Sequence, residues 1–204
     1  MLIEPTEQFT EQLALAEIGR IVSSSLNIDD IYEGFADAVA KLVPFDSIAI
    51  AMIDVKLGIV TLSYMTGKDW ATHQTGDQVP LANLDGSLLG AAIESKSSKL
   101  IQGSDREDLI GQFSTLSRAV DAGFRSFMLV PIISNDLVIG ALTLRSTKWN
   151  AYEDQQVQTV ERIAIQITGA LANVQLHSEL ARESNERETL AAIGRLINSS
   201  LNID

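Results

Sequence analysis

The feature that most constrains the fold is a pair of apolar stretches, residues 125–134 and 137–146, separated by only two residues. Both stretches are dominated by residues that favour β-strands. The intervening Asn135 and Asp136 belong to the residue types that tight hairpin turns prefer. The sequence therefore predicts an antiparallel hairpin, and the chain around it must supply the rest of a sheet.

The segments before this hairpin supply two helices and a second hairpin. Apolar residues at spacings of three and four predict a helix over 9–24 and a second helix that ends at Pro44. The second helix presents Ile31, Phe35, Val39 and Leu42 on one face. Residues 47–54 are apolar on both faces, which predicts a central, fully covered strand. Residues 59–65 are its expected hairpin partner.

The middle of the chain predicts shorter elements. Residues 66–83 are rich in Gly, Asp and Gln and are expected to be irregular. A short helix is predicted over 85–95 with Asp85 as N-cap, then a brief strand over 98–102 and a helix over 105–122.

A long helix is predicted from Tyr152 onward. Its apolar residues recur at spacings of three and four, which is typical of a helix that packs along another helix. They are Val157, Val160, Ala164, Ile167, Leu171 and Val174. Part of this stripe must pack on its own sheet, but the helix continues through a polar seam that includes Asn185. We therefore expect a parallel homodimer in which entry and exit helices form a bundle.

Taken together, this order of elements predicts an α+β fold. It is an antiparallel β-sheet with terminal helices packed on one face, short helices and loops covering the other, and a long C-terminal helix.

Composition excludes several kinds of chemistry. The chain of 204 residues has 15 basic and 27 acidic residues, a net charge of -12 that repels nucleic acid. It has no cysteine, which excludes disulfides, thiolate metal sites and cysteine nucleophiles. The two histidines, His73 and His177, do not support a metal site, and none is predicted. No apolar run reaches the length of a membrane helix and no secretory signal is present, so a cytoplasmic protein is expected.

Three segments carry a resemblance to a known family: residues 85–102, 122–146 and 152–180. The second is the most specific, with Arg125-Ser126, Pro131 and Gly140 in the order and spacing that the family uses. With the preceding helix and hairpin, residues 26–180 resemble a GAF domain. This family supplies the small-molecule-binding and dimerising modules of bacterial sensor kinases, phytochromes and cyclic-nucleotide phosphodiesterases.

A repeat indicates a tandem arrangement. Residues 190–204 repeat residues 15–29 with 11 of 15 positions identical and an offset of 175 residues, about one GAF domain with its connecting helix. We therefore expect an N-terminal bundle helix over 1–25, a GAF domain over 26–176, and a linker helix with the start of a second, truncated repeat over 177–204.

The resemblance also bears on ligands. Without cysteine the chain cannot attach a bilin covalently or carry out the family's sulfoxide reduction. The cyclic-nucleotide signature is not found. Gln78-Val79 stand before Pro80 where the haem-binding branch has a histidine, so haem is not favoured and the cofactor stays unknown.

The family's pocket lies over one sheet face, and aromatic and polar residues are expected near it. The candidates are Trp70, His73, Gln102, Phe113 and Arg125. In the alternative interpretation, Trp70 and Phe113 only fill the core. His177 followed by Glu179 faintly resembles a phosphoacceptor box, but the expected proline is missing, so a structural role is favoured.

The predicted function is a non-catalytic sensory and dimerisation module of a multidomain two-component protein, a sensor histidine kinase. It would bind a small molecule and act through its C-terminal helix on downstream domains of the same chain. No catalytic triad, paired-carboxylate cleft or metal cluster indicates an enzyme, and neither nucleic acid nor a membrane is expected as a partner of this segment. The alternatives are a ligand-free dimerisation spacer and the regulatory domain of a nucleotide cyclase.

Overall fold

A computed structural model describes residues 28–68, 74–166, 168 and 169, together with residues 12, 16 and 187. The chain divides into two compact units, Met1–Gly169 and Ala170–Asp204. The elements of the first unit are α2 (Ile28–Ala40), β1 (Ser47–Asp54), β2 (Ile59–Gly67), β3 (Gln78–Pro80), η1 (Leu81–Asn83), α3 (Leu88–Ser95), β4 (Lys99–Ile101), α4 (Arg106–Gln112), η2 (Ser114–Leu116), α5 (Ser117–Asp121), β5 (Ser126–Ser134), β6 (Leu137–Ser146) and a helix over 154–166.

The strands form one antiparallel sheet in the order β3-β2-β1-β6-β5-β4. The predicted hairpin of β5 and β6 is confirmed, and its turn residues Asn135 and Asp136 have φ values of 49° and 64°. Positive φ at both positions belongs to the two-residue turn whose twist matches that of the strands. Pro131 lies in β5 beyond the three residues that pair with β4, so its missing N–H interrupts no bond to that strand.

The strand over 47–54 is central, as its two apolar faces predict, because it pairs with β2 on one side and β6 on the other. β6 approaches it closely at Gly140. A Cβ on Gly140 would lie 2.7 Å from the carbonyl oxygen of Ala51. Only glycine fits there, which explains why this residue interrupts an otherwise apolar, branched strand.

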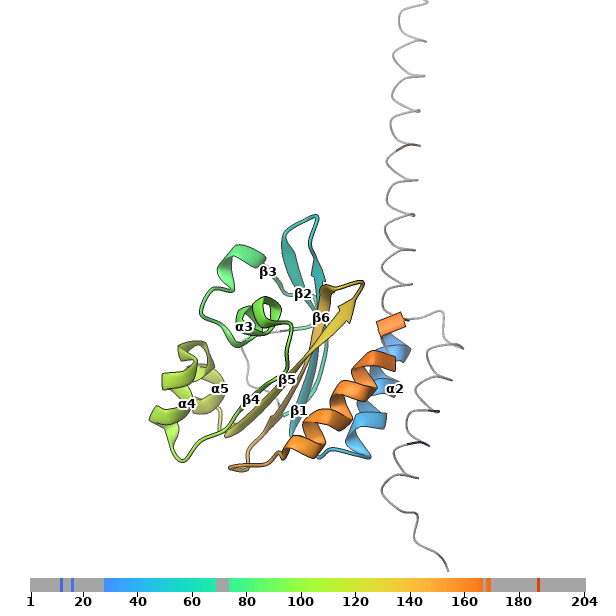
Figure 1. Cartoon of the computed structure of the whole chain (residues 1–204). Coiled ribbons are helices and arrows are strands. Elements are labelled where there is room, and N and C mark those ends of the chain that lie inside the picture. The colour runs from blue at the N-terminus through green and yellow to red at the C-terminus, as the bar shows by residue number, and fades with distance from the viewer. Residues whose placement is uncertain are drawn as a thin grey trace, which may run out of the picture. The chain divides into compact units, whose positions relative to one another are not determined.

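Two helices cover one face of the sheet, α2 and the helix over 154–166 (Figure 1). Both have an apolar stripe with helical spacing whose members are at most 2 % exposed; these are Ile31, Phe35 and Val39 in α2, and Val160, Ile163 and Ala164 in the later helix. The ring of Tyr32 in α2 packs against that of Tyr64 in β2, with centroids 6.0 Å apart. Part of the predicted C-terminal stripe therefore packs inside its own domain.

The opposite face is covered by α3, α4, α5 and their connections (Figure 1). Two apolar clusters fill the space beneath them. The larger joins these helices to β4, β5 and β6, and the smaller surrounds Ile53, Val60 and Val138. The predicted fold class, an antiparallel sheet between terminal helices and a cover of short helices and loops, is thus confirmed.

Some boundaries differ from the prediction. The helix expected over 85–95 begins at Leu88, because its N-cap is Ser87, whose Oγ accepts a hydrogen bond of 3.0 Å from Gly90 N. The helix expected over 105–122 has Asp105 as N-cap but divides into α4, η2 and α5. Phe113 interrupts it with extended backbone and packs against the larger apolar cluster. The irregular stretch after β2 contains β3 and η1.

Several predictions fall outside the described residues. They concern all but residues 12 and 16 of the helix over 9–24, the candidates Trp70 and His73, the stripe residues Ile167, Leu171 and Val174, His177, and the repeat over 190–204. Within the described part of the chain, no helix is long and apolar enough to span a membrane.

Candidate functional site: a cavity between the sheet and its helical cover

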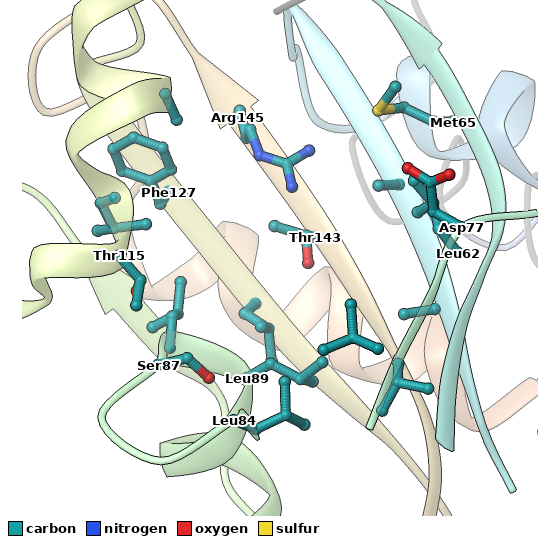
Figure 2. Close-up of a pocket in the computed structure, with 18 residues that line it drawn as sticks. Leu62, Met65, Asp77, Leu84, Ser87, Leu89, Thr115, Phe127, Thr143 and Arg145 are labelled. Carbon is teal, nitrogen blue, oxygen red and sulfur yellow. The ribbon is translucent and has the colours of Figure 1, made fainter. Parts of the chain in front are cut away.

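A cavity of about 250 Å³ lies between the sheet and its cover of short helices (Figure 2). Residues of both apolar clusters of this face line it, and Leu89 packs against both clusters. Most of the side chains around it are apolar. The described lining residues are Ala49, Ala51, Val60, Leu62, Met65, Asp77, Val79, Leu84, Ser87, Leu88, Leu89, Thr115, Leu116, Ala119, Phe127, Leu129, Thr143 and Arg145.

Small side chains on the central strand make room for this cavity. β1 presents Ala49 and Ala51 to it, and Ala51 pairs with Ala141 of β6. Larger side chains stand on the flanking strands, such as Leu62 of β2 and Leu129 of β5. Ala49 and Ala51, in the middle of the sheet, therefore form a shallow floor between taller walls.

The cover contributes its walls from three short segments. Leu88 and Leu89 come from the first turn of α3, whose position is fixed by the Ser87 cap. Thr115 and Leu116 come from η2 and Ala119 from α5. These segments are only a few residues long, so small shifts of the cover would change the cavity's shape.

The polar residues among the described lining residues are Asp77, Ser87, Thr115, Thr143 and Arg145. Ser87 and Asp77 form local hydrogen bonds. Ser87 Oγ caps α3, and Asp77 Oδ2 accepts a hydrogen bond of 2.8 Å from Gln74 N. Arg145 and Thr143 stand two residues apart on β6, so they share the face of the sheet that forms the floor (Figure 2).

Arg145 brings a positive charge to one end of this apolar space. Its Nη1 nitrogen is out of reach of solvent. Burial lowers the pKa of Arg145 to about 10, so the guanidinium stays charged at neutral pH. Around it the strand pairing places Phe127 of β5 on one side and Ser47 of β1 on the other.

Two hydroxyl groups near this end are buried without a hydrogen-bond partner among the described residues. They are Ser47 Oγ, on a residue that is 0 % exposed, and Tyr152 Oη, on a residue that is 3 % exposed. Burial raises the pKa of Tyr152, Asp46 raises it further, and Arg145 acts in the opposite direction. Buried polar groups normally find partners, so this end of the cavity has unused hydrogen-bonding capacity.

Three of the candidates predicted from the sequence are described, and none of them is among the described lining residues. The side-chain amide of Gln102 donates to Tyr152 O at 2.9 Å and accepts from Tyr152 N at 3.0 Å. Phe113 packs against the larger apolar cluster. Arg125 donates to Val120 O and Phe124 O, and its guanidinium lies 5.3 Å from the ring centre of Trp149.

The cavity thus brings together a set of residues that the sequence analysis did not choose. Arg145 and Thr143 carry a signal that was available: both are polar residues on a strand face whose other members, Leu137, Ile139 and Ala141, are apolar. The alanine floor carries no such signal, because alanine is common in every kind of structure.

The chemical capacity of the arrangement is that of a binding site. It offers an apolar space with a cation at one end and hydroxyl groups close to it, the mixture that small-molecule sites use. In the described part of the chain, no three His, Cys, Asp or Glu side chains come together as a metal site would require.

Comparisons with known proteins agree on the fold. A family model described as "GAF domain" matches residues 25–172. A GAF domain of phosphoenolpyruvate-protein phosphotransferase from Acinetobacter has a similar structure, with a TM-score of 0.64, 17% identity, and coverage of 83% of this chain and 97% of that one. No curated protein matches this chain.

Two further solved structures are similar at the level of the fold. The GAF domain of a two-component sensor histidine kinase from Bacillus halodurans has a TM-score of 0.61 and 19% identity, and the match covers 76% of this chain and 99% of that one. Free methionine-R-sulfoxide reductase from Neisseria meningitidis, solved with its substrate, has a TM-score of 0.62 and 14% identity, covering 87% and 96%. The family model spans most of this chain, and the chain therefore belongs to the GAF domain family.

Proposed function

We propose that this chain is a non-catalytic sensory and dimerisation module of a signalling protein, and that it binds a small molecule in the cavity between the sheet and its cover. The observation that carries the proposal is the cavity itself. An engineered cavity of about 150 Å³ accepts benzene, so about 250 Å³ accommodates a ligand on the order of ten non-hydrogen atoms. A related fold with a bound substrate, the Neisseria reductase, supports the interpretation.

The sheet offers one route from this cavity to the exit helix, which is the helix over 154–166. β1 and β6 line the cavity on one face through residues such as Ala49 and Thr143. On the other face, Ile48, Leu142 and Leu144 are buried beneath the terminal helices. A ligand that displaces these strands therefore also changes the surface on which the exit helix packs.

A second route runs through the edge strand β4, which lies between the cover helices α3 and α4 in the chain. Just before β4, Ser98 Oγ donates a hydrogen bond of 2.6 Å to Glu161 Oε1 of the exit helix. Just after it, Gln102 holds the backbone of Tyr152, two residues before that helix begins. A shift of the cover would thus be passed directly to the base of the exit helix.

The dimer is proposed from the exit helix. Ile165 is 71 % exposed on its outer side, whereas Ile163 and Ala164 are buried. We propose that Ile165 contacts the same helix of a second copy of the chain. By helical spacing the stripe residues Leu171 and Val174 share the side of Val160 and Ala164, not that of Ile165, so we propose that they form a separate dimer contact further along the helix. Residues 177–204 would lead as a linker into a further GAF-type repeat.

A histidine kinase is the output that we propose, because the Bacillus halodurans relative is a sensor histidine kinase. A ligand-free dimerisation spacer would use the same fold without this cavity having a role. The regulatory domain of a nucleotide cyclase is the other alternative, and it differs in the output domain.

Native mass spectrometry of the purified chain, compared with its denatured mass, tests the proposal. A dimer that carries an additional small mass for each subunit is expected, and the mass difference would begin to identify the ligand. A bare dimer that also binds nothing from a library of small molecules would favour the spacer.

Introducing a charge at Leu171 or Val174 is expected to give monomers, and a variant that remains dimeric would contradict the proposed interface.

A further inference from the structure

The polar groups of the cavity are arranged asymmetrically, and this asymmetry bears on the class of ligand. Arg145 is the single basic residue among the described lining residues. It stands at the end of the alanine floor, between Phe127 and Ser47. The rest of the floor and the cover is apolar apart from hydroxyl groups and the carboxylate of Asp77.

A guanidinium in an apolar space selects for a planar anion. It presents several N–H groups in a fixed fork that matches the two oxygens of a carboxylate. The hydroxyl of Ser47, which is buried and has no hydrogen-bond partner in the described part of the chain, lies directly across the strand pair from Arg145. It can donate a further hydrogen bond to such a group. Thr143 is the neighbouring residue on the same face of β6, and it offers another hydroxyl to the cavity.

The same arrangement disfavours more highly charged anions. A phosphate group carries a charge of about -1.5 to -2 at neutral pH, which one guanidinium does not balance. Asp77 stands beside β2, on the far side of β1 from Arg145, so it would repel a second negative charge at the other end of the ligand. Between the two charges lies the apolar floor of Ala49 and Ala51 with Leu62 and Leu129 beside it.

We propose that the cavity binds a monocarboxylate with an apolar body on the order of ten non-hydrogen atoms in total, whose carboxylate pairs with Arg145. This inference rests on the proposed ligand-binding function and adds the chemical class. The apolar body lies on the alanine floor under Leu88 and Leu89 of α3, so that binding draws the cover onto the sheet.

The test uses two probes of equal size, phenylacetate and its neutral counterpart phenylacetamide, with dissociation constants measured on the full chain by titration calorimetry or ligand-observed NMR. The unsubstituted protein is expected to bind phenylacetate at least tenfold more tightly than phenylacetamide. Arg145→Gln is expected to bring the two constants within about twofold. Arg162→Gln, which removes the same charge from an exposed part of the exit helix, should keep the preference. Ala51→Leu, whose larger side chain would fill the space above the floor, should weaken the binding of both probes at least tenfold.

The outcomes separate the two proposals. Equal affinity for the two probes in the unsubstituted protein, with loss of both in Ala51→Leu, would overturn the carboxylate class and keep the cavity as a binding site. A preference that survives Arg145→Gln in a folded variant would overturn the role of Arg145. If neither probe binds, or if Ala51→Leu changes nothing, the carboxylate class and the cavity as its binding site both fail. The comparison of probes needs no variant, so a failure of Arg145→Gln to fold does not prevent the test.

Discussion

At the scale of single residues, Asp46 joins the start of β1 to the end of β6. Its Oδ2 accepts hydrogen bonds from Thr147 N at 2.6 Å, Thr147 Oγ1 at 2.9 Å and Ser146 Oγ at 3.0 Å. The backbone bond from Thr147 contributes most to holding the pKa of Asp46 below its ordinary value of 3.8, against an opposing effect of burial. Asp46 therefore stabilises the fold in its ionised form.

This gives a prediction for Asp46→Asn. At pH 7 the substitution should lower the free energy of unfolding by about 1–2 kcal/mol, because charged hydrogen bonds become neutral ones at a partly exposed site. The stabilisation from a carboxylate with a lowered pKa is complete above the unfolded-state value and is lost as the pH falls through the lower folded-state value. The stabilities of the two proteins, measured by urea unfolding, should therefore differ at pH 7, begin to converge as the pH falls below about 3.8, and become equal below the lower folded-state pKa.

Asp37→Asn is the matched control, since Asp37 is exposed on α2 and the change in charge is the same. It is expected to change stability by no more than about 0.5 kcal/mol. A difference between Asp46→Asn and the unsubstituted protein that stays constant down to pH 2.5 would show that ionisation of Asp46 has no part in stability.

Gln102 offers a second prediction, because its side chain satisfies both backbone groups of Tyr152. Gln102→Ala should lower the free energy of unfolding by about 2–3 kcal/mol, since it leaves one donor and one acceptor without partners in a partly buried position. The affinity of the cavity for phenylacetate should stay within about twofold. If Gln102 contacts the ligand, as the sequence analysis predicts, calorimetry would instead show a loss of affinity.

At the scale of elements, the β5–β6 hairpin depends on its turn. Asn135 has a φ of 49°, a region that costs an alanine about 1 kcal/mol more than it costs asparagine or glycine. We predict that Asn135→Ala lowers the thermal midpoint by roughly 2–4 °C, as expected for a loss of about 1 kcal/mol in a domain of this size. Asn135→Gly should leave the midpoint unchanged or raise it slightly.

Ser134→Ala, at the neighbouring strand position, serves as the control and is expected to have little effect. An equal loss in Asn135→Ala and Asn135→Gly would mean that the asparagine side chain, and not its backbone conformation, stabilises the turn. Scanning calorimetry of the three variants distinguishes these cases.

At the scale of the whole molecule, the exit helix has two different sides. Val160, Ile163 and Ala164 are buried in its own domain, and Ile165 is 71 % exposed. We predict that Ile165→Glu weakens the proposed dimer at least tenfold while the thermal midpoint of the domain changes little. Sedimentation equilibrium over a range of concentrations measures the first effect and circular dichroism the second.

Gln166→Glu introduces the same charge at the adjacent exposed position and should leave the dimer intact. If Ile165→Glu and Gln166→Glu dimerise as strongly as the unsubstituted chain, this part of the helix lies outside the interface. If both weaken the dimer equally, net charge rather than apolar contact determines the association.

The sequence alone was enough for the features that depend on local patterns. Its β-forming apolar stretches predicted the sheet, the residue types at Asn135-Asp136 predicted the turn, and helical spacing predicted the apolar stripe of α2. Three segments indicated the family. These features follow from the preferences of neighbouring residues for one backbone conformation, and such preferences do not need the rest of the fold. Boundaries were not determined in this way, because Asp85 and Ser87 are both residue types that cap helices, and in the structure it is Ser87 that caps α3.

The tertiary structure decided the cavity and its polar end. Arg145 and Ser47 are nearly a hundred residues apart, and only the pairing of β1 with β6 makes them neighbours. The side-chain amide of Gln102 can hydrogen-bond a ligand, but in the folded chain it hydrogen-bonds the backbone of Tyr152. A side chain's role depends on which partner reaches it, and for residues that meet across a sheet the register of the strands determines that partner.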